Sequence, residues 1–158
     1  MARKYKQGFY KPTNPQKYKG KVDSIIYRSG WELACFKQWD SNPRILAWSS
    51  EEVVIPYISP LDNKQHRYFI DAKLRYRNRK GNIEEAMIEI KPYDQCRPPK
   101  QQKRITAQYK EKVRAYLVNK AKWDKTIKVC QASKMKFVLL TERGSYGWDG
   151  EIKKLINE

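Results

Sequence analysis

The sequence predicts a single α/β domain with a mixed, largely antiparallel central sheet flanked by helices. Segments with helical spacing and segments with strand alternation follow one another in the order α, β, β, β, α, β, α. The chain has 158 residues, of which 40% are hydrophobic and 13% aromatic. That is enough for one well-packed core and too little for a second full domain.

The charge balance predicts a polyanionic partner. Lys and Arg number 34 against 17 Asp and Glu, a net charge of +17, so nucleic acid is the first candidate. The longest apolar runs, such as 137–140, are too short to cross a membrane, and the first residues contain no apolar secretion signal. Three widely spaced cysteines form neither a CxxC pair nor a disulfide framework, which favours a reducing cytoplasm.

The first 21 residues predict a basic N-terminal arm, followed by a single domain over 22–158. The arm contains seven Lys or Arg residues and no Asp or Glu, and such a segment cannot build its own core. Phe9, Tyr10 and Tyr18 either pack on the body or stack on bases, and a solvated tail is the alternative. The arm residues expected to contact DNA phosphates are Lys4, Lys6, Lys11, Lys17 and Lys19.

A helix and then a strand are predicted after the arm. Residues 29–40 carry Trp31, Cys35 and Trp39 at helical spacing, with Ser29 as the N-cap. Asn42 and Pro43 end this helix, and the β-branched segment 53–58 predicts a strand.

A hairpin is predicted next. In 67–76 the apolar side chains alternate with polar ones, and 83–92 repeats the alternation after the turn-forming residues 78–82. Glu89 and Lys91 share one face of the second strand, about 7 Å apart.

The last third of the chain predicts a helix over 108–121, which continues or kinks into 123–130, then a strand over 136–140 and a short C-terminal helix over 149–156. Between residues 97 and 136 there are 13 Lys or Arg and two acids. Outside the arm, the expected phosphate contacts are Arg67, Lys100, Lys103 and Arg104.

The candidate chemistry lies in the hairpin. Asp71 on one strand and Glu89 on the next supply the oxygen ligands that Mg²⁺ prefers, while the Lys91 ammonium orients the attacking water. The alternative is a solvated polar strand face, with Asp71 paired to Arg67 or Lys73. The strongly basic context and the apolar faces of both strands favour the metal site.

Glu32 has two interpretations that its spacing leaves open. Ser29 and Glu32 form a capping box, in which the Glu32 carboxylate would accept from the Ser29 amide. The functional alternative makes Glu32 a further metal ligand, directly or through water.

A helix with Glu32 is followed by a strand with Asp71 and then by a strand with Glu89 and Lys91. This order resembles the PD-(D/E)xK nuclease superfamily, whose restriction-endonuclease-like core has the order αβββαβ. Ile70 stands where the superfamily name has proline. Longer strings resemble the head completion nucleases of T-even-type tailed phages. The strings are Gly8–Gly20, Ile26–Leu33, Ile55–Pro60, His66–Asp71 and Glu89–Tyr93.

The resemblance implies a DNA nuclease that acts late in phage assembly on packaged DNA, before head and tail are joined. It implies Glu32, Asp71, Glu89 and Lys91 as the active-site set, with Mg²⁺, or alternatively Mn²⁺, held by the acids and the Ile90 carbonyl. The implied partners are the packaged genome and portal or neck proteins of the phage head. The implied location is the host cytoplasm during assembly and then the head–tail junction.

Two rival functions remain open. One is a non-catalytic DNA-binding protein of virion assembly, and the other is a transposon-end or junction nuclease of the same fold.

Overall fold

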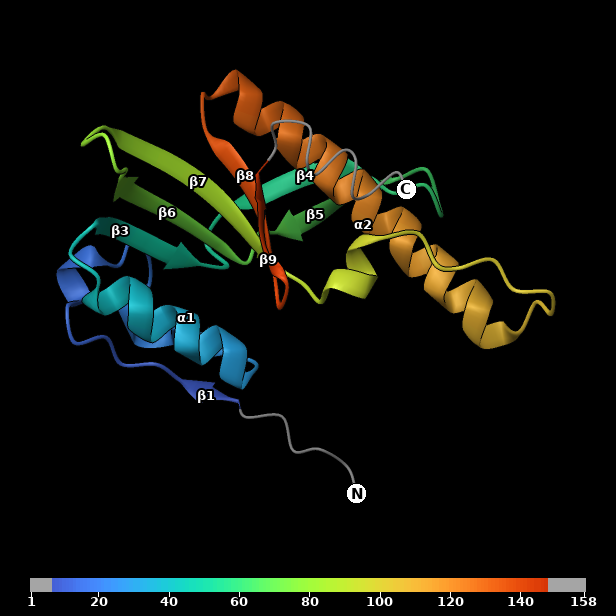
Figure 1. The fold of residues 1–158 in the computed structure, drawn as a ribbon, viewed down its shortest axis with the longest axis horizontal. Coiled ribbons are helices and arrows are strands. Elements are labelled where there is room, and N and C mark those ends of the chain that lie inside the picture. Colours follow the sequence, from blue (N-terminus) through green and yellow to red (C-terminus); the bar gives the residue numbers. More distant parts are fainter. Residues whose placement is uncertain (1–6, 148–158) are drawn as a thin grey trace.

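The computed structural model describes residues 7–147 (Figure 1). The helix expected over 149–156 lies outside this range, as do Lys4 and Lys6. The two α-helices are α1 (Gly30–Ser41) and α2 (Ala107–Ala132). The strands are β1 (Gly8–Phe9), β2 (Ile26–Tyr27), β3 (Ile45–Ser50), β4 (Val54–Ile58), β5 (Gln65–Phe69), β6 (Ala72–Arg77), β7 (Ile83–Ile90), β8 (Lys136–Thr141) and β9 (Gly144–Gly147).

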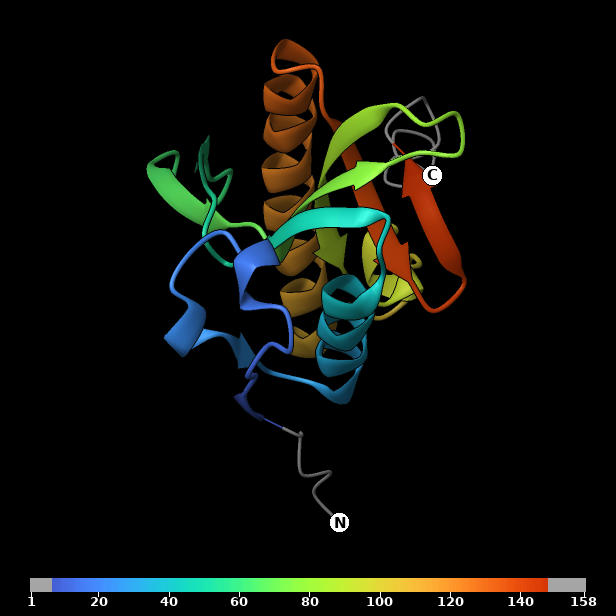
Figure 2. The same ribbon diagram turned by 90° about the vertical axis from the view of Figure 1, so that its left-hand side faces the viewer.

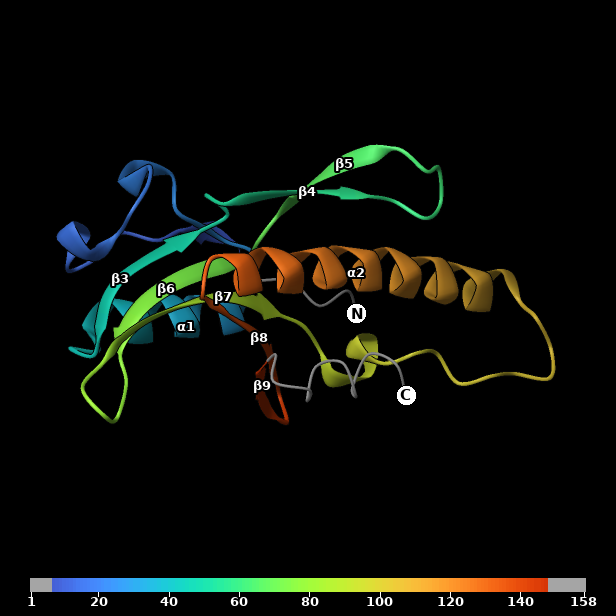
Figure 3. The ribbon, with the colours of Figure 1, turned by 90° about the horizontal axis from the view of Figure 1, so that it is seen from above.

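The central sheet has five strands in the order β3-β6-β7-β8-β9. The β7–β8 pair is parallel and the other three pairs are antiparallel. Helix α1 covers one face and α2 the other (Figures 1 and 3). The chain order α1, β3, β6, β7, α2, β8 gives the αβββαβ core, so the fold class is confirmed.

The strand predicted over 67–76 is two strands, and this prediction was wrong. β5 pairs with β4 in a separate two-stranded sheet, whereas β6 pairs with β3 and β7 in the main sheet. The burial alternation runs on across the break, but Tyr68 and Ile70 pack on the α2 side while Ala72 and Leu74 pack on the α1 side. The chain therefore changes layers at Asp71.

The first strand of the core is also different from the predicted one. It is β3, which begins two residues after Pro43, and the predicted strand at 53–58 is β4 of the extra hairpin. The β4–β5 hairpin lies against α2 (Figure 2), where Ile55 and Tyr57 join the core on that side. β9, which was not predicted, extends the sheet beyond β8.

The sheet separates two hydrophobic cores. Trp123, Ile127 and Phe137 lie in the core beneath α2. The core beneath α1 is aromatic, and Trp48 lies 5.2 Å from Phe36 between ring centroids. The three cysteines are free, and each lies buried in one of these cores.

Residues 7–21 pack against the body, so no gap in the packing marks the arm boundary expected at residue 21. Tyr18 is 6% exposed and stacks edge-on against Trp48. The Lys19 amide donates to the Trp48 carbonyl at 2.9 Å, which covers the outer edge of β3. Packing on the body, the first alternative, is found for Tyr10 and Tyr18, whereas Phe9 is 75% exposed and does not pack there.

Helix α2 is one continuous helix of 26 residues, without the kink that was an alternative. It begins at Thr106, whose hydroxyl accepts from the Tyr109 amide at 3.1 Å. Its first half projects beyond the sheet (Figure 1), and its second half lies over β7 and β8. Within residues 7–147 no helix combines the length and apolarity needed to cross a membrane.

Candidate active site

The two acids of the predicted site are neighbours across β6 and β7. The antiparallel register pairs Ala72 with Ile88, and continuing it by one residue places Asp71 opposite Glu89. Asp71 Oδ2 accepts a hydrogen bond of 2.7 Å from the Ile90 amide. β7 continues two residues beyond the start of β6, so the last residues of β7 have no backbone partner in β6. The Asp71 side chain supplies the acceptor for the Ile90 amide there. The hairpin register thus brings Asp71 and Glu89 together.

Glu89 is deeply buried because β7 is an inner strand with a helical layer on each face. Its exposed fraction is 5%. The Tyr68 hydroxyl donates to Oε2, and Lys91 Nζ lies 3.6 Å from Oε1. Both partners are themselves ionisable, and Tyr68 reaches Glu89 from the β4–β5 hairpin.

Burial dominates the electrostatics of the pair. Desolvation, together with the Glu89 charge, raises the pKa of Asp71 to about 8. Desolvation also raises the pKa of Glu89, although Lys91 and the Tyr68 hydroxyl oppose the shift. The pKa of Tyr68 is well above its usual value, because of burial and the neighbouring Glu89 charge. The pair carries more negative charge than its surroundings neutralise.

The donor set fits a divalent cation. Two desolvated carboxylates with raised pKa values bind a proton readily, and a hard cation with oxygen preference neutralises the same surplus charge. Asp71 is only partly buried, so this end of the strands is open to water. Within residues 7–147 no three His, Cys, Asp or Glu side chains gather as a metal cluster, and the acids that lie together here are Asp71 and Glu89.

Glu32 lies near this pair and also acts in the helix cap. Its amide donates to Ser29 Oγ at 3.0 Å, so the predicted N-cap is confirmed. Its carboxylate accepts from the Arg28 amide at 2.5 Å, one residue earlier than a capping box requires. Its charge also helps to raise the pKa of Asp71. The predicted bond from the Ser29 amide to the Glu32 carboxylate is therefore wrong, because that carboxylate binds the Arg28 amide instead.

Two residues of the site were not predicted. Tyr68 lies on the apolar face of its strand. A buried tyrosine hydroxyl usually has a hydrogen-bond partner, so this position could have indicated that Tyr68 contacts a polar group. Lys122 of α2 lies 5.3 Å from the centroid of the Tyr68 ring. Nothing in the sequence distinguishes it from the other lysines of that basic segment.

The basic residues expected at DNA fall into two groups. Lys17 is part of the fold, because its Nζ donates to the carbonyls of Trp39, Asp40 and Asn42 at 2.7–2.9 Å. The exposed ones are Lys11, Lys19, Arg67, Lys100, Lys103 and Arg104.

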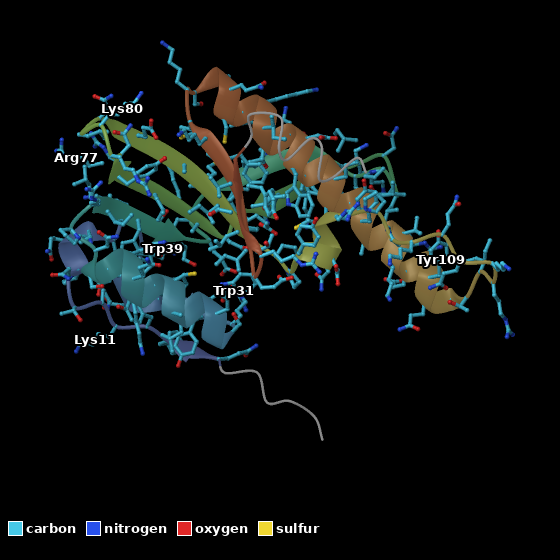
Figure 4. The ribbon with its side chains drawn as sticks, in the orientation of Figure 1. Lys11, Trp31, Trp39, Arg77, Lys80 and Tyr109 are labelled. Carbon is cyan, nitrogen blue, oxygen red and sulfur yellow. The ribbon has the colours of Figure 1, made fainter. Side chains whose placement is uncertain are left out.

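The exposed positive charge is spread over several elements. Figure 4 shows Lys11 below α1, and Arg77 and Lys80 at the tip of the β6–β7 hairpin. Tyr109 lies at the opposite end, on the projecting half of α2.

An αβββαβ core with an acid beginning its second strand and Glu-x-Lys ending its third defines a nuclease of the restriction-endonuclease-like fold. Residues 42–142, more than half of the chain, match the family described as TnsA-like endonuclease N terminal. The chain belongs to this family. The matched range contains Asp71, Glu89, Lys91 and Lys122 but not Glu32.

A named relative extends this result beyond the family range. The chain is 36% identical over 141 residues to the "Head completion nuclease" of Enterobacteria phage T4. The alignment covers 87% of this chain and 91% of that protein. No solved structure matches the chain.

Proposed function

We propose that this protein is a metal-dependent DNA nuclease that acts in phage head completion, on packaged DNA before head and tail are joined. The observation that carries the proposal is the pairing of Asp71 with Glu89 across β6 and β7, next to Lys91. The similarity to the T4 head completion nuclease over most of both chains supports the biological setting.

In the proposed mechanism Asp71, Glu89 and the Ile90 carbonyl would hold Mg²⁺, with Mn²⁺ as the alternative ion. A divalent ion bound there would supply Lewis-acid chemistry for phosphodiester hydrolysis. Lys91 orients the attacking water from the neighbouring position on the strand, and Tyr68 fixes the Glu89 carboxylate by its hydrogen bond. Glu32 adds to the site through a water molecule.

The proposed setting places the protein in the host cytoplasm during assembly and at the head–tail junction afterwards, where portal or neck proteins are its partners. The exposed residues of the predicted set, Lys11, Lys19, Arg67, Lys100, Lys103 and Arg104, hold the DNA backbone. Lys4 and Lys6, in the terminal segment, are included in this proposal. We leave Lys17 out of it, because its ammonium is bound to three carbonyls.

The test is cleavage of supercoiled and linear DNA with and without Mg²⁺, comparing Glu89→Ala with the wild type. The variant is expected to lose cleavage while binding DNA as well as the wild type or more tightly, because a buried negative charge is removed. Glu85→Ala is the matched control. Glu85 lies on the same strand and pairs only with Lys73, at 3.3 Å on the surface, so its loss is expected to leave cleavage intact.

The outcomes separate the proposal from the non-catalytic alternative. Retained cleavage in Glu89→Ala contradicts the assigned site. Salt-sensitive DNA binding without cleavage in any divalent metal, by the wild type itself, supports a DNA-binding assembly protein instead.

The family match favours one further candidate, a transposon-end or junction nuclease with the same site residues. Linear, branched and transposon-end DNA substrates distinguish the two. A strong preference for the branched or transposon-end DNA would move the function away from head completion.

A further inference from the structure

Helix α2 places a second ammonium group beside the acid pair. Lys122 precedes Trp123, which with Thr126 and Ile127 is buried in the α2-side core and fixes the rotation of the helix. Lys122 Nζ lies 5.3 Å from the ring centroid of Tyr68 and 5.8 Å from that of Tyr57. Because the Tyr68 hydroxyl donates to Glu89, the same ring links this ammonium to the candidate active site.

The ammonium lacks a close acidic partner. Among the ion pairs of residues 7–147, all within 4.0 Å, none involves Lys122, although its side chain is half-buried. The two ring faces stabilise a cation there, but a ring accepts no conventional hydrogen bond. An ammonium carries three N–H donors, so Lys122 keeps donors free for an acceptor that arrives from solution.

The surrounding charges indicate which acceptor fits. Burial lowers the pKa of Lys122, and the charges of Glu89 and Asp71 oppose that shift, so the acids favour the charged form. Glu89 already has Lys91 and Tyr68 as its close partners. Lys122 is therefore a cation near the acids that forms a close ion pair with neither of them, and such a cation suits a phosphate oxygen of bound DNA.

We propose that Lys122 is a second cation of the active site and binds a phosphate of the DNA backbone adjacent to the scissile bond. The proposal rests on the nuclease function proposed above and adds a residue from α2 to the strand-borne set. Lys91 and Lys122 then flank Glu89 from two different elements, and the DNA strand lies between α2 and the ends of β6 and β7.

The test compares Lys122→Met with Lys128→Met. Both changes remove one positive charge from α2 and keep the aliphatic stem, but Lys128 is exposed and lies about 120° round the helix axis from Lys122. Lys122→Gln serves as a second variant should the methionine lower the melting temperature. The measurements are single-turnover cleavage at saturating enzyme, and the affinity for uncut duplex DNA in EDTA against salt concentration.

Lys122→Met is expected to cleave about 100-fold more slowly than Lys128→Met at saturation. Its salt slope should be smaller than that of the wild type by about 0.9, the value for one lost phosphate contact. Equal cleavage rates for the two variants would overturn the proposal. So would an unchanged salt slope accompanied by weaker Mg²⁺ activation, because that pattern assigns Lys122 to positioning Glu89.

The salt-slope measurement keeps the two proposals separable. If the wild type does not cleave, the nuclease proposal fails. The salt dependence of uncut-DNA binding by Lys122→Met then tests the phosphate contact by itself. A salt slope equal to that of the wild type overturns the contact.

Discussion

Two acids are buried among residues 7–147, and they are held in different ways. Asp40 lies in the last turn of α1 and is 2% exposed, and Glu89 lies in β7 beneath α2 and is 5% exposed. Asp40 accepts from the Tyr10 hydroxyl and the Thr13 amide at 2.8 and 2.7 Å, and from the Asn14 amide at 3.0 Å. Two of these donors are fixed backbone groups of the N-terminal segment, so the contact joins one part of the fold to another.

Glu89 has ionisable side chains as partners and a second carboxylate beside it. Burial raises the pKa of Glu89, and Lys91 and Tyr68 offset that rise only in part. A structural acid is stabilised by neutral donors already present in the folded chain. The partners of an acid that binds a metal do not fully stabilise its buried charge, and this lowers the stability of the folded protein at the site.

The largest effect that sharpens this comparison is on stability. Asp40→Ala leaves the Thr13 and Asn14 amides without their acceptor, and we expect the free energy of unfolding to fall by ~3 kcal/mol. For a chain of this size the melting temperature should drop by roughly 6–12 °C. Glu89→Ala, measured in EDTA, should lose less, because it also removes an unfavourable buried charge.

Asp40→Asn is the matched variant, since it keeps one carbonyl oxygen as an acceptor and should lose less stability than alanine. Thermal unfolding of all three variants without metal decides the matter. If Glu89→Ala proved less stable than Asp40→Ala, the distinction between a structural acid and one that binds a metal would be wrong.

A smaller effect is expected from pH in the metal-free protein. The pKa of Asp71 is about 8 in the folded state, against 3.8 for an ordinary aspartate. Between these values the folded state holds a proton that the unfolded state has lost, so stability falls as pH rises. With the site partly open to water, we expect a loss of about 2 kcal/mol between about pH 5 and pH 7.

Asp71→Asn cannot titrate and should flatten this part of the profile while keeping an acceptor for the Ile90 amide. Chemical unfolding in EDTA at several pH values measures the slope. A variant whose stability declines as steeply as that of the wild type would show that Asp71 does not hold the proton.

The acid pair could be predicted from the sequence because it depends on local structure. Asp71 and Glu89 belong to consecutive strands, and alternation with a short turn is enough to place them side by side. The layer change at Asp71 could not be predicted, since alternation determines which side chains are buried but not which strand is the partner. Segment 67–76 therefore looked like one strand, although β5 and β6 belong to different sheets.

The rest of the site depends on tertiary packing. Lys122 reaches Tyr68 only because α2 crosses the sheet at one angle and rotation, and helical spacing within α2 does not determine either. For Lys17, too, the sequence could not show which role the packing gives it. It looked like any lysine of a basic arm, and only the path of residues 7–21 around α1 brings its ammonium to the helix end.

The smallest effect extends the comparison to two lysines of the N-terminal segment. Lys17→Met removes a cation from the C-terminal end of α1, and we expect a loss of about 1 kcal/mol in stability with an unchanged salt slope of DNA binding. Lys11 is exposed, so Lys11→Met should leave the melting temperature unchanged and reduce that slope by about 0.9. Thermal unfolding and salt-dependent binding on both variants give opposite patterns if charge in this segment is divided between folding and DNA. The same pattern in both variants would mean that burial does not separate the two roles.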